Sequence, residues 1–304
     1  MYDSAVWIVR MYYIVNLYMV YDQLAGIRAR GLSGATLDPV WPLIWVEQVG
    51  LELGSLTILY FSIAAGFVGV LFWQYRSARV VVALSQLFVA GFVNSFGGIG
   101  HSLHEWLWIG VCFVFLPTGP LSETGGTRAG RFTFLTVFSL AQGLILLFYS
   151  LSGLYKVSAA LQALLAGEVG GFSLEAMALT LANRMLQSNT DAVWAPFIIE
   201  NGWLGWPLYV GLYYVEFVSI VILFRPSLHR IWGFILIAFH FGTFLFMEIP
   251  FPDHVLINAM LFVYSPFRPD KTSWASALQQ LPIFGVLARR LIRHPPLPVT
   301  FVVR

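Results

Sequence analysis

The chain has 304 residues, of which 58% are hydrophobic and 11% are charged, and its formal net charge is +2. Soluble domains carry roughly 25% charged residues, so this composition excludes an ordinary soluble protein and indicates a membrane protein. A net charge this small argues against nucleic-acid binding. The single cysteine, Cys112, excludes a disulfide framework.

Eight apolar segments are predicted to form membrane-spanning helices, because a bilayer core about 30 Å thick needs roughly 20 apolar residues per helix. The last segment is short and lies between Pro252 and Pro266, so a tilted or re-entrant piece stays open for it. The sequence predicts an all-α, polytopic membrane helical bundle. Its spans are expected at residues 5–25, 53–73, 80–98, 101–117, 132–155, 202–224, 231–249 and 254–267.

Basic residues gather in every second loop along the chain, and cytoplasmic loops of membrane proteins are enriched in Lys and Arg. With eight crossings these residues share one side with the N-terminus, whereas most acids lie in the opposite loops. We therefore predict that both termini are cytoplasmic, in the inner membrane of a bacterium. The basic residues are Arg76, Arg79, Arg128, Arg131, Arg225, Arg230, Arg268, Lys271, Arg289, Arg290, Arg293 and Arg304.

The chain is expected to divide into a transmembrane domain, residues 1–268, and a cytoplasmic tail, residues 269–304. The tail is amphipathic over 274–293 and is predicted to lie on the anionic inner leaflet. The long outer loop 157–201 is expected to contain one helix, Leu174 to Leu186, opened by Ser173 as N-cap.

Lys156 is the first candidate for chemistry, because it ends the fifth predicted span and the chain has only one other lysine. An ammonium group at membrane depth is costly unless it is paired, hydrated or used. Tyr149, Ser152 and Lys156 are spaced by three and four residues and so share one helix face. Gly153 would let a neighbouring helix or ligand approach closely.

Four histidines are placed near the outer ends or the middle of their spans. His101 and His104 are three residues apart at the start of span four, His240 lies deeper in span seven, and His254 follows the turn to span eight. Together with Lys156 they predict an outward-facing pocket between spans four, five, seven and eight, roofed by the loop after span five.

Two further readings concern the remaining ionisable groups. Arg10 in span one and Glu216 in span six are predicted to form a structural ion pair between helices. A metal or haem site is the alternative use of the histidines, although no tight ligand spacing supports it. Such a site would combine His101, His104, His240 and His254 with Glu105 or Glu216.

Three short stretches carry a family resemblance: Gly100-His101-Ser102, Tyr149 to Lys156, and His240 followed by Glu248-Ile249-Pro250-Phe251-Pro252. They resemble the membrane domain of the vitamin K-dependent gamma-glutamyl carboxylase and its bacterial relatives, the HTTM (horizontally transferred transmembrane) family. The resemblance runs to about residue 268, and Arg10 fits the family's arginine in the first helix.

The resemblance implies roles for individual residues. Lys156 matches the base that deprotonates vitamin K hydroquinone, and His101 matches the histidine that supports the anionic intermediate. The substrate would lie against Tyr149, Ser152, His104, His240 and His254. Two departures weigh against protein carboxylation: Tyr155 stands where the carboxylase has a second lysine, and the short tail leaves no room for its large lumenal region.

Three functions remain open from the sequence. The first is a quinol-dependent carboxylase-like or oxygenase-like enzyme. The second is a non-catalytic accessory subunit of an energy-transducing or photosynthetic membrane complex, holding a lipid, quinone or pigment. The third is a modifier of a secreted peptide that relies on a separate partner for recognition. Alternatively, Lys156 has no chemical role and only extends its ammonium group from a helix end to the membrane interface.

Overall fold

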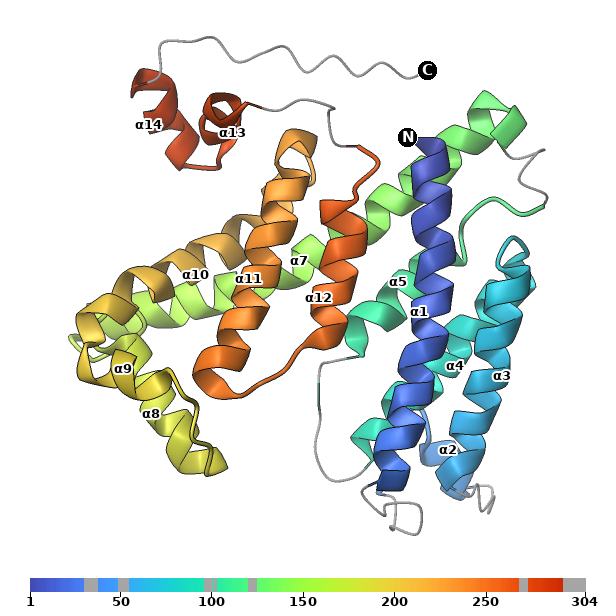
Figure 1. Ribbon diagram of the computed structural model, residues 1–304, viewed down its shortest axis with the longest axis horizontal. Helices are drawn as coiled ribbons and strands as arrows, with labels where there is room; N and C mark the ends of the chain where they lie inside the picture. The colour runs from blue at the N-terminus through green and yellow to red at the C-terminus, as the bar shows by residue number, and fades with distance from the viewer. Residues whose placement is uncertain are drawn as a thin grey trace. The chain divides into compact units, whose positions relative to one another are not determined.

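The computed structural model describes residues 1–29, 38–48, 55–95, 100, 103–119, 125–267 and 273–291, and every regular element in those ranges is a helix (Figure 1). The predicted all-α fold is therefore confirmed. The chain divides into two compact units, Met1–Leu144 and Ile145–Arg304. The boundary between these units falls inside α7 (Arg128–Ala166).

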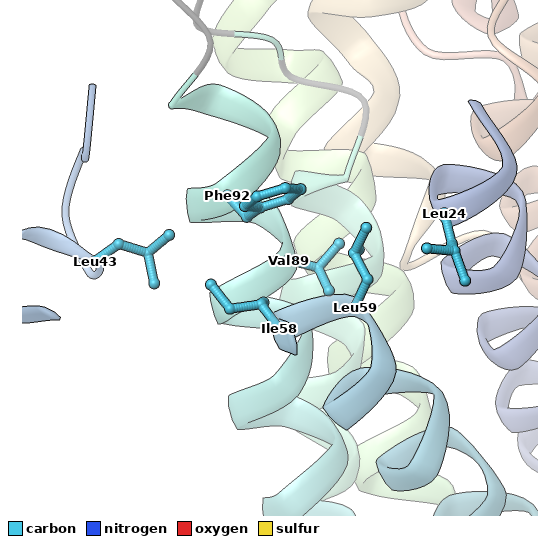
Figure 2. Close-up of a cluster of buried hydrophobic side chains, with 6 residues drawn as sticks. All are labelled: Leu24, Leu43, Ile58, Leu59, Val89 and Phe92. Carbon is cyan, nitrogen blue, oxygen red and sulfur yellow. The ribbon is translucent and has the colours of Figure 1, made fainter. Parts of the chain in front are cut away.

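The first unit is a group of neighbouring helices in which α3 packs against both α1 and α4, and α5 packs against α4 (Figure 1). One of its apolar clusters joins α1, α3 and α4 through the buried side chains of Leu24, Leu59 and Phe92 (Figure 2). The elements are α1 (Tyr2–Ala29), α2 (Ile44–Gln48), α3 (Ser55–Phe72), α4 (Arg76–Asn94) and α5 (His104–Phe113), followed by the first part of α7.

The second unit contains the rest of α7 and the remaining helices. The short helices α8 and α9 pack on α10 and α11 around the buried Leu181, and α11 packs against α12 and the π-helical turn η3. The elements are α8 (Ala176–Ser188), α9 (Ala195–Glu200), α10 (Gly202–Ile222), η2 (Pro226–Leu228), α11 (His229–Met247), α12 (Pro252–Asn258), η3 (Ala259–Val263), α13 (Trp274–Gln280) and α14 (Phe284–Leu291).

Within the described ranges, four helices are long and apolar enough to cross a membrane: Arg76–Asn94, Arg128–Ala166, Gly202–Ile222 and Pro226–Met247. Two shorter apolar helices, Thr57–Phe72 and Pro252–Val263, accompany them. The chain thus has the helices expected of a membrane protein. Each of the eight predicted spans overlaps a helix, but α5 is only 10 residues long and α1 carries Arg10 and Asn16 among its apolar residues.

The prediction that Lys156 ends its helix is wrong. The helix α7 continues to Ala166, because the ten residues after Lys156 contain no Gly or Pro. It ends at Gly167, which has a positive φ of 72°. The Gly167 N–H donates to the Leu164 carbonyl and the next N–H, from Glu168, donates to Ala163. This pattern is the Schellman motif, which satisfies the last carbonyls of a helix.

The helix of the outer loop begins later than expected. α8 starts at Ala176, and Ser173 does not cap it, because its hydroxyl accepts a hydrogen bond from the N–H of Gly170 at 3.0 Å. Ser173 therefore closes the turn between α7 and α8. Serine serves such turns by the same side-chain acceptor chemistry that makes it a helix cap.

Candidate functional site

Lys156 and Glu216 form an ion pair between α7 and α10 in the second unit. The Nζ of Lys156 donates to both carboxylate oxygens of Glu216, at 2.6 and 2.7 Å. The lysine side chain is 35% exposed and the glutamate only 3%. The hydroxyl of Ser152 adds a hydrogen bond to the same carboxylate. A buried carboxylate is thus held by an ammonium group that is itself reachable from outside the unit.

The ion pair sits beside a close approach of the α7 and α10 backbones. A Cβ on Gly153 would lie 2.3 Å from the backbone nitrogen of Phe217, so only glycine fits there. One turn further along α10, the N–H of Ile220 donates to the Ser150 hydroxyl at 2.8 Å. The close approach expected at Gly153 is therefore found, and α10 is the neighbour.

A second polar group lies on the same face of α7. The Tyr149 hydroxyl is 2.6 Å from His240 Nε2 on α11, and it accepts a hydrogen bond from Asn258 Nδ2 on α12 at 2.9 Å. Asn258 Nδ2 also donates to the His254 carbonyl at 2.8 Å, which fixes the orientation of the amide. All four residues are buried or nearly so.

One direction among these hydrogen bonds is set: the Asn258 amide donates to the Tyr149 oxygen. The direction of the bond between Tyr149 and His240 Nε2 depends on the tautomer of the imidazole. The buried Nδ1 of His240 has no hydrogen-bond partner among the described residues. A buried polar atom without a partner is costly, so a bound group with a complementary polar atom would be stabilised beside it.

Aromatic rings and one carboxylate surround His240. The ring of His254 lies 4.8 Å from that of His240, and Phe251 lies 5.2 Å from it, centroid to centroid. The carboxylate of Asp253 approaches His254 Nδ1 to 3.2 Å. The Tyr149–His240–His254 cluster thus has the Phe251 ring beside His240 and the Asp253 carboxylate beside His254.

The remaining predicted site residues divide as follows. His101 lies outside the described residues. His104 belongs to the first unit, where it lines a cavity of about 680 Å³ with residues of α4 and α5 such as Leu84 and Trp108. The second unit therefore holds two polar groups: Lys156 and Ser152 with Glu216, and Tyr149, His240 and His254 with Asn258.

The predicted ion pair between Arg10 and Glu216 stays a prediction, because the two residues belong to different units. Both oxygens of Glu216 are engaged by Lys156, and the exposed Arg10 holds its guanidinium 5.7 Å from the ring centre of Trp73. The sequence singled out Glu216 and Lys156 separately. Their pairing depends on how α7 and α10 are rotated against each other, which no local pattern states.

Asn258 was missed by the sequence reasoning. It lies four residues after His254 in an apolar run, and this spacing places both on one helix face. A polar residue in that position was the signal that could have found it. Among the described residues, no group of three His, Cys, Asp or Glu side chains is arranged to hold a metal ion.

A cavity of about 350 Å³ lies between α8, α10 and α11 in the second unit. Its lining is almost entirely apolar, with Tyr209 and Thr243 as the polar exceptions. Phe239 and Thr243, which flank His240 along α11, both contribute to it. An apolar molecule or chain of moderate size would fit beside the polar cluster.

Comparisons with known proteins add no relative: no protein-family model matches the chain, and neither a curated protein nor a solved structure is detectably similar to it.

Proposed function

We propose that this chain is a multi-pass membrane protein that removes a proton from a quinol-type substrate with Lys156, supported by Glu216. The contact between Lys156 Nζ and both oxygens of the buried Glu216 carries the proposal. It couples a reachable amine to a buried carboxylate, which is the arrangement that a proton-transfer step requires.

The ion pair explains how an amine could become a base at membrane depth. Burying two charges is expensive even when they are paired, and a proton can pass from Lys156 to Glu216 over a short hydrogen bond. That transfer leaves a neutral amine on the more exposed partner. The amine then accepts the substrate's phenolic proton and becomes an ammonium group again.

The polar cluster fits the far end of such a substrate. Tyr149 and Lys156 lie seven residues apart on α7, which is about 10 Å along the helix. That separation is comparable to a quinol headgroup with a hydrogen bond at each end. His240 offers its Nδ1, which has no hydrogen-bond partner in the described ranges, to an oxygen of the headgroup. A bound quinol supplies the acidic hydroxyl, and the apolar lining between α8, α10 and α11 would take its tail.

The topology we propose has eight spans, with both termini on the cytoplasmic side of a bacterial inner membrane. The distribution of arginines supports it. So does the contact between Arg225, after α10, and the Gln280 carbonyl at the end of α13, because it keeps the end of α10 and the C-terminal helices on one side. The pair α12–η3 would then return the chain across the membrane.

The proposal is tested on the full-length protein in lipid nanodiscs loaded with menaquinol. Deprotonation of the bound quinol shifts its absorbance to longer wavelength, and we expect that shift with the native protein. Lys156→Met and Glu216→Gln should abolish it, while Glu200→Gln, at an exposed position on α9, should leave it unchanged.

A structural role for the pair predicts something different. If Lys156→Met leaves both the bound quinol and its absorbance unchanged, Lys156 is not at the site. Purification in mild detergent with mass spectrometry separates the remaining case. A stable multi-protein assembly that carries no quinone and is insensitive to Lys156→Met would make the chain a non-catalytic subunit.

A further inference from the structure

The two C-terminal helices α13 and α14 are fastened to the second unit near the α10–α11 turn (Figure 1). The Tyr214 hydroxyl donates to the Pro282 carbonyl at 2.6 Å, and the two rings of Tyr214 and Phe284 lie 4.8 Å apart. Arg225 donates to the Gln280 carbonyl and Ser227 to the Gln280 side chain. The helices thus have a defined orientation on the unit.

That orientation turns the apolar face of α14 outward. Phe284, Leu287 and Leu291 are spaced by three and four residues and so share one face, yet they are 54%, 57% and 74% exposed. The buried position is Gly285, where a Cβ would lie 2.4 Å from the Gln279 carbonyl oxygen. A helix packed on a water-soluble protein would bury this stripe instead.

The turn before α14 points to the same conclusion. Ile283 has a positive φ of 62°, a conformation that is a genuine outlier for a β-branched residue. Glycine or asparagine would adopt it more easily. The side chain of Ile283 is 63% exposed, so the strained position presents one more apolar group on the outside.

The charges beside this face have one sign. Arg289 lies on the side of α14 opposite the stripe, Arg290 lies beside Leu287 at the edge of the stripe, and Arg225 and Arg230 flank the neighbouring turn. Residues 273–291 contain no Asp or Glu. An exposed apolar stripe with arginines beside it complements one partner, the headgroup and acyl boundary of an anionic leaflet.

We propose that α13 and α14 form an interfacial anchor, lying in the plane of an anionic membrane surface with Phe284, Leu287 and Leu291 inserted below the headgroups. The anchor rests on the chain being embedded in a membrane but not on the proposed chemistry at Lys156. The exposed apolar residues of both helices that would enter the boundary are Trp274, Leu278, Ile283, Phe284, Val286, Leu287 and Leu291.

The test uses the full-length protein with Cys112→Ser, so that single cysteines can be introduced. Leu287→Cys reports on the stripe and Arg289→Cys on the opposite side. Each is labelled with an environment-sensitive dye and reconstituted in phosphatidylcholine vesicles, with or without about one quarter phosphatidylglycerol. A lipid carrying a quencher within its acyl chain reports depth.

We expect strong quenching at position 287, weak quenching at 289, and deeper insertion at 287 when the anionic lipid is present. Adding Arg290→Gln to Leu287→Cys should reduce the dependence on lipid charge by about fivefold in apparent lipid affinity. Equal aqueous accessibility at 287 and 289 would overturn the anchor. Protection of position 287 that rises with protein concentration would also overturn it, because it would indicate a second copy of the chain. The same holds for protection that disappears when residues 292–304 are removed.

Discussion

Lys156 is partly exposed, whereas its partner Glu216 is buried. Removing the lysine should therefore lower the stability of the protein. Lys156→Met leaves a buried carboxylate without its cation, and breaking a buried pair costs several kcal/mol. Because the lysine is partly exposed, we expect about 2 kcal/mol, seen as a lower apparent Tm of the detergent-solubilised protein. The double variant Lys156→Met/Glu216→Met should recover most of that loss, since two apolar side chains of similar volume replace the pair. Failure of the double variant to recover stability would show that the single substitution disturbs packing instead.

We expect His240 to be in one defined tautomer, with the Tyr149 hydroxyl donating to Nε2, because the Tyr149 oxygen already accepts a hydrogen bond from Asn258. Nitrogen NMR of the histidine-labelled protein should show His240 protonated on Nδ1. Tyr149→Phe removes the donor to Nε2, costs about 1 kcal/mol of stability, and should allow the proton to exchange between the two ring nitrogens. An Nε2–H signal for His240 in the native protein would contradict the assignment of donors.

The sequence identifies individual polar residues of the second unit more readily than it identifies which of them pair with each other. Lys156, Tyr149 and His240 stand out in the sequence because polar groups in apolar helices must be accounted for, and all three belong to polar groups of the second unit. The partner of Lys156 could not be foreseen, because it depends on the rotation of α10. The place of His101 in any site stays a prediction, since it lies outside the described residues.

At the scale of elements, the crossing of α7 and α10 depends on Gly153. Gly153→Ala would press a methyl group against the Phe217 backbone, which cannot retreat as a flexible side chain can. Overpacking of this kind costs about 1–3 kcal/mol. The matched control is Gly211→Ala in α10, where nothing lies within 4 Å of the added carbon. That change should be neutral or stabilise by up to about 1 kcal/mol. Thermal unfolding of both variants distinguishes them, and equal Tm values would mean that the two helices are not in close contact.

Arg79 connects the turn after α3 to the turn after α5 in the first unit. The hydrogen bonds observed for its guanidinium among the described residues include no carboxylate. Arg79 is 1% exposed, and its guanidinium donates to the carbonyls of Trp73, Gln74, Leu116 and Pro117. Carbonyls at the ends of helices carry partial negative charge, which favours a cation there.

Lysine cannot reproduce this set of bonds, because it lacks the planar fork of arginine. We expect Arg79→Lys to destabilise the protein by about 2 kcal/mol, whereas Arg76→Lys, at an exposed position, should change the Tm by less than a degree or two. A comparable loss for both variants would indicate that charge, not the bonding pattern of Arg79, stabilises this end of the unit.

The lengths of elements show where sequence reasoning stops. The apolar runs predicted a helix in every proposed span, because hydrophobic stretches bounded by Gly, Pro and charges are a local signal. The predicted end of the helix at Lys156 is about ten residues too early, because a charged residue marks a membrane boundary without ending a helix. Between Lys156 and Gly167 the chain has no Gly or Pro, and Gly167 decides where the helix ends.

At the scale of the whole molecule, the open question is whether the α12–η3 segment crosses the membrane. Its 12 residues span only about 18 Å as a helix, less than the roughly 30 Å of a bilayer core. The contacts of Arg225 and Tyr214 with residues 280–282 nevertheless keep the C-terminal helices beside the turn at which α11 begins. Since α11 leaves that turn, α12–η3 has to bring the chain back toward it.

Single cysteines in the Cys112→Ser background can test this in sealed vesicles with a maleimide that does not cross membranes. Arg230→Cys marks the α10–α11 turn, Glu168→Cys the segment after α7, and Ser273→Cys the start of α13; all three positions are exposed. If α12–η3 returns the chain, positions 230 and 273 should react from the cytoplasmic side and position 168 only from the other. Labelling of 273 together with 168 would make α12–η3 re-entrant. It would also require the bonds of Arg225 and Tyr214 to residues 280–282 to break, because groups on opposite sides of a bilayer cannot share a hydrogen bond.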